Sequence, residues 1–432
     1  MRRLAFLVPC LLLALPGSAQ AAKVSLGGPA GDYFDGPNLD YTAGAGEAND
    51  VTVSVASDHS VTVRDAGAPL TEGSGCAKVD AHTARCSTAT GSPTIESASV
   101  SLGDRDDRAT LSVPRAAGWG ALGVDGGPGA DAVDASAVID VVDPKEEFGA
   151  LSVDGGTGDD HLIGGPGHDT LTGGRGADRL EGGPGVDTLD GDGAAGGPFG
   201  SDRLDGGRGS DTVTYEPRRR GVRVDLAGHR GGGSGERDSL RSIENVIGGN
   251  GRDVLEGDGR ANELAGSGVL FQHRGSGDRL VGRGGNDTLF DFGGASRLDG
   301  GPGRDEVAGV NARDRVRCGR GRDRISEFNR VLMAPDCERM DTQSYRYSRL
   351  VVHGSSARIR TGLVPDAGRC KVRLTLRSRG GRLYGRTRFH GRRRLRIRLT
   401  RAGRRAASLH RVASVDAFER CGDTHDRWRV RF

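Results

Sequence analysis

The sequence predicts an all-β protein that is organised around a parallel β-solenoid. The main observation is a run of four tandem nonapeptides over residues 155–190, which reads GGTGDDHLI, GGPGHDTLT, GGRGADRLE and GGPGVDTLD. A period of nine residues is too short for a helical hairpin and is typical of a parallel solenoid. A leucine recurs at every ninth residue. Flexible glycine-rich linkers have no such periodic leucine, so the pattern argues against a linker.

Each position of the nonapeptide has a physical reason. Paired glycines allow turns with positive φ, which a β-carbon would oppose. The sixth position places an aspartate in each turn, and the eighth places a leucine on a short strand that faces inward. One repeat cannot bury its leucine alone, so the repeats must stack. The glycines predicted to form these turns are Gly155, Gly156, Gly158, Gly164, Gly165, Gly167, Gly173, Gly174, Gly176, Gly182, Gly183 and Gly185.

The run resembles the RTX (haemolysin-type) calcium-binding repeat of secreted bacterial proteins. The resemblance implies a β-roll in which two nonapeptides make one coil, so that Asp160 stacks on Asp178 and Asp169 on Asp187. It also implies several calcium ions between successive coils, held by aspartates and turn carbonyls, since calcium takes about six to eight oxygen ligands. The predicted calcium ligands are Asp131, Asp160, Asp169, Asp178, Asp187, Asp202, Asp211, Asp253, Asp287 and Asp305.

The repeat pattern extends beyond this run but is interrupted. Residues 119–131 match residues 148–160, and the pattern returns after an insert at 215–247, which is expected to form a strand-loop-strand excursion. Asn262 and Ser296 stand where an aspartate is expected, and a hydroxyl is a poorer calcium ligand than a carboxylate. We therefore expect Ser296 to bind no calcium. The turns at Asp314 and Asp323 have lost glycines and are expected to close the roll.

The chain divides into four predicted regions. Residues 22–120 show short alternating apolar segments and a degenerate repeat turn at 102–107, which indicate a β-rich cap stacked on the roll. The regions are a signal peptide at 1–21, an N-terminal β cap at 22–120, an RTX-like calcium-binding β-roll at 121–340, and a basic C-terminal β domain at 341–432.

The first 21 residues have the features of a secretory signal. Arg2 and Arg3 precede an apolar stretch over residues 4–15, and Ala19-Gln20-Ala21 is a small-x-small cleavage site. The apolar stretch is too short for a transmembrane helix, and no other candidate follows. We expect the protein to be secreted or extracellular, and it could be associated with the cell surface.

Six cysteines remain after the signal, and an even number in an oxidising compartment favours disulfides. A structural zinc site is the weaker alternative because no C-x-x-C occurs. The cysteines fall into three local pairs along the chain. The predicted pairs are Cys76–Cys86, Cys318–Cys337 and Cys370–Cys421.

The formal net charge of +3 conceals an acidic middle and a basic end. Residues 121–310 carry 34 acidic against 19 basic side chains, whereas residues 341–432 carry 6 against 25. An acidic middle suits a divalent cation. Alternating apolar residues in 341–432 predict a small β-sandwich with an arginine-studded face, which either binds an anionic cell-surface polymer or is simply solvated. Nucleic acid is an unlikely partner for a secreted chain.

No recognisable catalytic motif occurs in the sequence. There is no H-E-x-x-H zinc motif, and residues 232–236 (GGSGE) fail the nucleophile-elbow pattern at the last position. A glycosidase-like acid pair stays open, although the same acids are already accounted for as calcium ligands. His161 and His168 occupy variable repeat positions and are expected to face solvent.

The sequence thus predicts a secreted calcium-binding β-roll with no catalytic site, structural or adhesive at the cell surface, whose folding is coupled to calcium binding. Two alternatives remain open at this point. One is a secreted hydrolase that uses the repeats as a folding module, and the other is binding of an anionic cell-wall polymer by the C-terminal domain.

Overall fold

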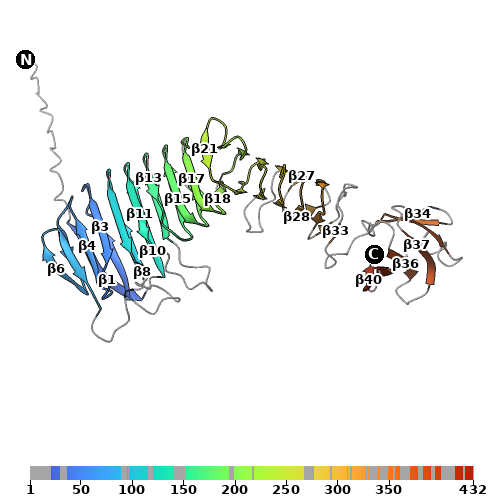
Figure 1. The fold of residues 1–432 in the computed structure, drawn as a ribbon, viewed down its shortest axis with the longest axis horizontal. Coiled ribbons are helices and arrows are strands. Elements are labelled where there is room, and N and C mark those ends of the chain that lie inside the picture. The colour runs from blue at the N-terminus through green and yellow to red at the C-terminus, as the bar shows by residue number, and fades with distance from the viewer. Residues whose placement is uncertain are drawn as a thin grey trace, which may run out of the picture. The chain divides into compact units, whose positions relative to one another are not determined.

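A computed structural model describes side chains within residues 21–27, 37–88, 95, 97–114, 120–139, 151–193, 199–216, 218–266, 277–291, 294–308 and 314–325. Further strands are described by their backbone up to residue 431. Every regular element among the described residues is a β-strand, as the sequence predicts (Figure 1). None of the described residues belongs to a helix that is long and apolar enough to cross a membrane. The predicted signal peptide lies outside the described residues, apart from Ala21.

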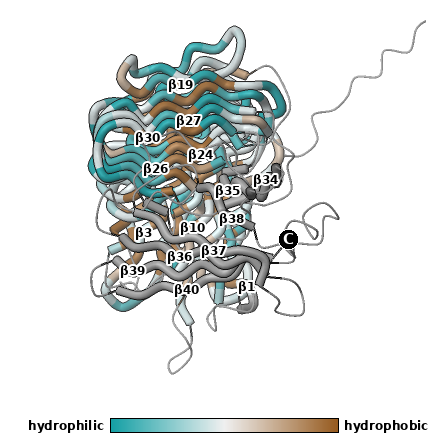
Figure 2. Tube along the Cα trace, turned by 90° about the vertical axis from the view of Figure 1, so that its right-hand side faces the viewer, coloured by the Kyte–Doolittle hydropathy of each residue, from teal (hydrophilic) through white to brown (hydrophobic). Residues whose placement is uncertain are grey.

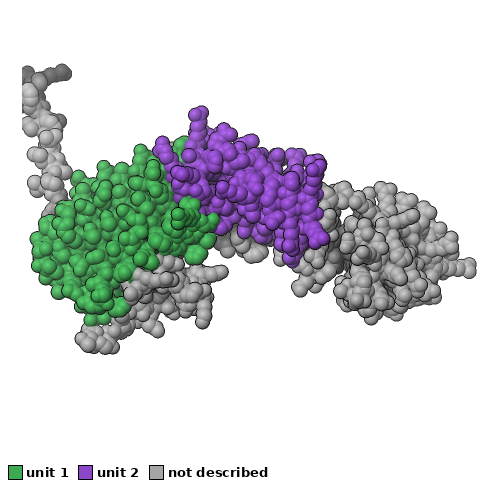
Figure 3. Space-filling model, in the orientation of Figure 1, with its two compact units in different colours: residues 1–202, 207–209 green, residues 203–206, 210–432 purple. Residues whose placement is uncertain are grey.

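The chain forms two compact units, shown in different colours in Figure 3. Unit 1 comprises residues 1–202 and 207–209, and unit 2 comprises residues 203–206 and 210–432. The four predicted regions follow sequence patterns rather than compactness, and their boundaries stay predictions.

Unit 1 begins with strands that switch from antiparallel to parallel pairing. They are β1 (Ala22–Pro29), β2 (Pro37–Thr42), β3 (Asp50–Val55), β4 (Val61–Asp65), β5 (Leu70–Glu72), β6 (Cys76–Asp80), β7 (Thr83–Cys86), β8 (Ser97–Ser101) and β9 (Arg108–Val113). Antiparallel pairing joins β3 to β4, and parallel pairing joins β2 to β8 and β3 to β9. Alternate residues of β3 are buried, which is the burial pattern of a strand with one face on the core. The predicted Cys76–Cys86 disulfide is confirmed.

The tandem repeats continue these sheets as parallel coils. Their strands are β10 (Ala121–Pro128), β11 (Ala132–Val138), β12 (Leu151–Thr157), β13 (His161–Ile163), β14 (Thr170–Arg175), β15 (Arg179–Gly185) and β16 (Thr188–Asp190). One sheet runs β8-β10-β12-β14-β16 and the other β9-β11-β13-β15. Leu162 pairs with Leu180 and Leu171 with Leu189, so residues eighteen apart stack, as the repeat predicts.

The stacked leucines form the core of the roll. Leu162, Leu171, Leu180 and Leu189 are fully buried. Burial of one such side chain contributes about 1.5–3 kcal/mol relative to exposure. Because each coil supplies only two of these side chains, stability depends on the neighbouring coils and on what happens in the turns.

Unit 2 repeats the same arrangement with shorter strands. They are β17 (Arg203–Gly209, in part), β18 (Thr212–Thr214), β19 (Arg223–Asp225), β20 (Arg230–Gly231), β21 (Asp238–Arg241), β22 (Asn245–Ile247), β23 (Val254–Glu256), β24 (Glu263–Ala265), β25 (Arg279–Val281), β26 (Thr288–Phe290), β27 (Arg297–Pro302), β28 (Glu306–Ala308), β30 (Arg315–Arg320) and β31 (Arg324–Ile325). One sheet contains β18-β22-β24-β26-β28-β31 and the other β19-β23-β25-β27-β30. Figure 2 shows hydrophobic segments along these coils and hydrophilic turns at their edges.

The predicted insert forms an antiparallel excursion within this stack. Strand β20 pairs antiparallel with both β19 and β21. A buried ion pair between Arg218 Nη1 and Glu236 Oε1 (2.7 Å) joins its two sides, and the Tyr215 hydroxyl donates to Asp238 Oδ2 at 2.9 Å. The excursion is therefore fixed to the roll by buried polar contacts.

The C-terminal strands form a separate antiparallel sheet. They are β34 (Arg349–His353), β35 (Ser356–Arg360), β36 (Cys370–Arg377), β37 (Leu383–His390), β38 (Leu395–Leu399), β39 (Ser414–Cys421) and β40 (Thr424–Arg431), all in one seven-stranded sheet. The backbone register sets Cys370 opposite Cys421, and their pairing stays a prediction. Cys318 is disulfide-bonded, and its predicted partner Cys337 lies outside the described residues. Two short pairs, β29 (Val310–Asn311) with β32 (Phe328–Asn329), and β31 with β33 (Arg339–Met340), end the roll.

Candidate metal centre

Buried aspartates line the turns of the roll. All ten aspartates predicted from the repeat are at most 5% exposed. Charged side chains are almost never this buried unless they are paired or bind a metal. The described residues do not gather three or more His, Cys, Asp or Glu side chains in one place. Any cation held here would therefore need backbone oxygens as well as carboxylates.

The aspartates of unit 1 form a one-directional ladder of hydrogen bonds. The backbone N–H of Asp131 donates to Oδ1 of Asp160 at 2.7 Å, and that of Asp160 donates to Oδ1 of Asp178 at 2.8 Å. Asp178 continues the ladder to Asp202 at 2.9 Å. On the other edge, Asp169 donates to Asp187 at 2.9 Å. The two aspartate pairs that the repeat predicts to stack are thus in direct contact.

The ladder begins inside the N-terminal strands, where the repeat is degenerate. The backbone N–H of Asn49 donates to Oδ1 of Asp107, and that of Asp107 donates to Oδ1 of Asp131 at 2.8 Å. Asn49 is the first member of the ladder and carries a neutral amide in place of a carboxylate. Its Nδ2 donates to the carbonyl of Leu102 at 3.0 Å.

In several of these aspartates the second carboxylate oxygen, Oδ2, is buried and has no hydrogen-bond donor among the described residues. The residues for which this holds include Asp107, Asp131, Asp160, Asp178, Asp287 and Asp305. By contrast, Oδ2 of Asp169 accepts from the backbone N–H of Gly165 and that of Asp253 from Gly249. A buried anionic oxygen without a donor is costly, which makes it a site for a cation.

Glycines bring backbone oxygens close to these carboxylates. A Cβ added at Gly155 would lie 2.5 Å from Asp160 Oδ2 and 2.7 Å from the carbonyl oxygen of Gly173 in the next coil. Gly174 has φ +109°, and a Cβ there would collide with the carbonyl of Gly156. Only glycine permits coils to approach this closely, and the approach brings carboxylate and carbonyl oxygens of successive coils together.

Burial raises the pKa of the ladder carboxyls well above their usual range. Desolvation is the main cause, and it raises the pKa of Asp160 to about 6 and that of Asp178 to about 7. The neighbouring Asp202 and Asp160 add to the rise at Asp178. In unit 2, desolvation raises the pKa of Asp287 to about 7. A bound cation would reverse this effect, because it favours the ionised carboxylate.

The ladder of unit 2 includes residues that the repeat pattern does not identify. Val222 donates to Asp253 at 2.8 Å, Asp253 to Asp278 at 2.9 Å, and Asp278 to the hydroxyl of Ser296 at 2.8 Å. Desolvation raises the pKa of Asp278 to about 8. Ser296 thus keeps the ladder hydrogen bond but supplies no carboxylate, which leaves the prediction that it binds no calcium in place.

The other edge of unit 2 continues through a neutral residue. Asn262 donates its backbone N–H to Asp287 Oδ1 at 2.9 Å, Asp287 to Asp305 at 2.9 Å, and Asp305 to Asp323 at 3.1 Å. The Asn262 side-chain amide donates to the carbonyl of Glu244 at 2.9 Å. Asp314 and Asp323 are fully buried, so these closing turns keep the ladder despite their missing glycines.

Sequence reasoning did not place Asn49 in the ladder, nor Glu244, whose Oε2 accepts the backbone N–H of Asp211 at 3.0 Å. Asp107 and Asp278 are the ladder aspartates that it missed. Each precedes an inward-facing apolar residue by two positions, Ala109 and Leu280, as in the repeat itself. That D-x-apolar signal could have found them. The two predicted solvent-facing histidines have side chains in contact with neighbours: His161 Nε2 lies 3.2 Å from Glu181 Oε1, and His168 Nδ1 lies 3.2 Å from the carbonyl of Val186.

The fold and the oxygen-lined turns define a class, the parallel β-roll with a hard-cation site between coils. A family profile of the RTX calcium-binding nonapeptide repeat matches this chain in four copies, over residues 153–193, 199–214 and 275–307. The chain therefore carries RTX repeats and is a calcium-binding β-roll protein. No curated protein matches it.

The residues present fit calcium. The donors that face the turns are carboxylate and carbonyl oxygens, which calcium prefers, and the described turns contain no thiolate or imidazole set that would favour zinc. The bound ion would neutralise the facing carboxylates. The protein's own part is to fix the Oδ1 atom by the ladder hydrogen bond, so that Oδ2 is held toward the turn.

Proposed function

We propose that this chain is an exported protein whose β-roll folds upon binding several calcium ions and acts as a structural or adhesive module at the cell surface. One observation carries the proposal: a series of buried Asp Oδ2 atoms has no hydrogen-bond donor among the described residues. Proteins with RTX repeats are typically extracellular, which supports export.

Electrostatics explains why folding and calcium binding are coupled. Successive coils of parallel strands lie about 4.8 Å apart, so ladder carboxylates on one edge repel one another when they are ionised. Without a cation, folding must either protonate or desolvate these groups. Calcium removes the repulsion, and its binding free energy becomes folding free energy. Extracellular calcium modules bind with dissociation constants of about 10⁻⁴–10⁻³ M, which the calcium outside cells would saturate.

The proposal is tested by circular dichroism and isothermal titration calorimetry on the full chain. We expect β-structure to increase when calcium is added to chelator-treated protein, with several ions bound. Magnesium at the same concentration should produce a much smaller change, because it demands tighter octahedral geometry. Identical spectra in chelator and in excess calcium would contradict coupled folding.

A matched pair of variants separates ladder carboxylates from surface charge. Asp178 is fully buried in the ladder, whereas Asp154 is exposed in the same unit. We expect Asp178→Asn to weaken calcium binding roughly tenfold, about 1.4 kcal/mol, and Asp154→Asn to change it little. Equal losses in both variants would mean that bulk acidity, and not the ladder, binds calcium.

We also propose that the chain has no catalytic centre. In the described roll, the buried aspartates of the repeat turns belong to the ladder, and several surface acids form ion pairs with arginines. The competing function is a secreted hydrolase with the roll as a folding module. Turnover of polysaccharide or ester substrates by the purified, calcium-loaded chain would favour the hydrolase.

A further inference from the structure

The two faces of the roll in unit 2 carry different residues in the same repeat position. On the sheet that contains β25, β27 and β30, the seventh repeat position holds Arg279, Arg297 and Arg315, which pair in register on adjacent strands. On the opposite sheet the same position holds Thr288, Glu306 and Arg324, so the charges there are mixed. Arginines in register on parallel strands lie about 4.8 Å apart. All three are exposed, so like charges form a column on one face.

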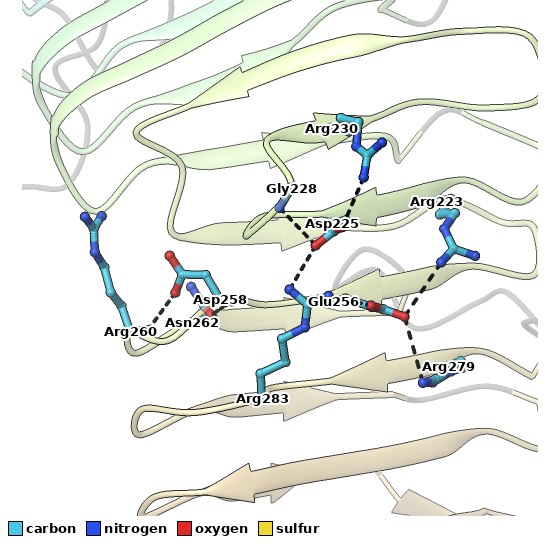
Figure 4. A network of polar contacts seen from close by, with 10 residues as sticks. All are labelled: Arg223, Asp225, Gly228, Arg230, Glu256, Asp258, Arg260, Asn262, Arg279 and Arg283. Carbon is cyan, nitrogen blue, oxygen red and sulfur yellow. Dashed lines mark hydrogen bonds and ion pairs between the residues drawn. The ribbon is translucent and has the colours of Figure 1, made fainter.

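At the upstream end of the arginine-bearing face, the arginines have acidic partners (Figure 4). Glu256 lies 2.8 Å from Arg283, 3.8 Å from Arg279 and 4.0 Å from Arg223. Asp225 lies 2.9 Å from Arg283 and 3.8 Å from Arg230. Each of these four arginines therefore has an acidic partner, and the two acids on neighbouring strands lower the net charge of the group from +4 to +2.

Downstream, exposed arginines greatly outnumber surface carboxylates. Residues 294–308 and 314–325 contain seven exposed arginines and only two surface carboxylates, Asp299 and Glu306. Those two lie near Arg317 at 3.9 Å and Arg324 at 3.8 Å. The remaining five have no ion-pair partner among the described residues. They are Arg297 and Arg315 in the column, Arg320 at the end of β30, and Arg304 and Arg322 in the turns that follow β27 and β30; we call these five the arginine strip.

We propose that the arginine strip binds a linear anionic polysaccharide, and that calcium in the roll strengthens this binding. Guanidinium groups bind carboxylate and sulfate groups through paired hydrogen bonds. A column with a regular spacing along the roll suits an extended chain that carries charges at repeated intervals. The calcium dependence rests on the proposed function, whereas the strip itself rests only on the arginines.

The chemistry of the strip favours a polysaccharide over nucleic acid. Single-stranded nucleic acids are bound largely by stacking of bases on aromatic side chains. The described residues from 294 to 325 include no Phe, Tyr or Trp. The surface therefore offers charge and hydrogen-bond donors but no platform for bases.

Calcium affects the arginine strip through the buried aspartates of the same coils. Asp305, Asp314 and Asp323 belong to the same coils and are buried in the ladder. When they are ionised without a cation, they offset the arginines; with calcium bound they are neutralised, and the coils keep a positive face. Calcium also fixes the coils and hence the spacing of the column.

The test compares two double variants of the full chain on immobilised heparin, a linear sulfated polysaccharide, over a salt gradient in calcium. Arg297→Gln with Arg315→Gln removes two unpaired arginines, and Arg223→Gln with Arg230→Gln removes two paired ones. Both change the net charge equally, and any contribution from the basic C-terminal residues is the same in both. We expect roughly tenfold weaker binding for the first pair, about 1.4 kcal/mol, and little change for the second.

The outcomes are distinguishable from failure of the proposed function. Calcium titration by circular dichroism on the same samples reports whether the roll binds calcium and whether each variant folds. Heparin binding that drops equally in both double variants, or binding by wild type that ignores calcium although the roll folds with it, would overturn the inference. Tighter binding of a single-stranded DNA oligonucleotide than of heparin would replace the polysaccharide with nucleic acid.

Discussion

The two oxygens of each ladder aspartate have different roles. Oδ1 accepts the backbone N–H of the preceding coil, as in the 2.8 Å bond from Asp160 to Asp178, and this bond fixes the side-chain rotamer. In Asp160 and Asp178, Oδ2 is then held in a buried position without a donor in the described residues. The hydrogen bond to Oδ1 holds neighbouring coils in register without metal. The buried Oδ2 without a donor raises the free energy of the folded roll unless a cation binds. We therefore propose that one residue type couples coil stacking to calcium.

A glycine series in unit 2 tests the close approach of coils. Gly301 has φ +101°, and a Cβ there would overlap the carbonyl oxygen of Arg283. Gly235 has φ +99° but open space around it, and Gly259 has open space and no positive φ. We expect Gly301→Ala to lower the unfolding free energy of calcium-loaded protein by about 3 kcal/mol or more, and Gly235→Ala by about 1 kcal/mol.

Gly259→Ala is the control and should be neutral or slightly stabilising, by up to about 1 kcal/mol, because alanine restricts the unfolded chain. Urea denaturation in excess calcium measures all three variants. If Gly235→Ala were as damaging as Gly301→Ala, backbone strain alone would explain the glycines, and close packing of coils would not.

Residue roles were predictable from the sequence where the spacing is regular. The eighteen-residue stacking of Asp160 on Asp178 follows directly from the nonapeptide. The ladder steps to Asp131 and Asp278 span 24 and 25 residues, because the sequence between these strands is longer than one double repeat. A search at fixed period misses them. The extra length does not change the register, because pairing is decided by the buried apolar residue and the ladder bond, both of which are local.

The turn of the N-terminal cap keeps the positive φ of the repeat turns although its glycine is replaced. Arg105 has φ +98° at the place where the repeat uses Gly129 or Gly158. Such a backbone costs about 1–3 kcal/mol for a residue with a β-carbon. The surrounding contacts hold it: Ala130 N–H donates to Asp106 Oδ1 at 2.9 Å, just as Ala177 donates to Asp159 at 2.8 Å. Strain at Arg105 could not be foreseen from a glycine pattern.

The turn at 102–107 predicts one more calcium ligand than the repeats suggest. Asp107 is 3% exposed, and its Oδ2 has no donor among the described residues. We expect Asp107→Asn to lower the calcium stoichiometry in calorimetry by about one ion, since an amide oxygen is a weaker ligand than a carboxylate. The exposed Asp104 in the same turn supplies the control Asp104→Asn.

An unchanged stoichiometry in Asp107→Asn would mean that the array begins at Asp131. A variant of Asn49 provides a second test, because Asn49 is the terminal residue of the ladder and has a neutral amide. If the array does extend to Asp107, Asn49→Asp should not fall below wild type in calcium stoichiometry.

At the scale of the whole molecule, the two parts of unit 1 are stabilised by different forces. The N-terminal strands bury large side chains such as Tyr41, Leu39 and Leu111 and are joined by the Cys76–Cys86 disulfide. The coils from β13 to β16 bury one leucine per strand and place ionisable aspartates in their turns. The first part has an ordinary hydrophobic core, and we propose that the second depends on the cation.

This contrast predicts that the cap survives calcium removal and the roll does not. In chelator, limited trypsin digestion should cut the roll at Arg175 and Arg179 while leaving a protected fragment that covers about residues 21–114. In excess calcium, those two sites should be protected as well. Mass spectrometry of the early fragments identifies the cuts. Cleavage at Arg64 or Arg85 as fast as at Arg175 in chelator would show that the cap also needs calcium, and the roll would then not grow from a preformed end. Slow cleavage at Arg175 without calcium would instead mean that leucine stacking alone holds the coils, because ladder repulsion would be too weak to open them.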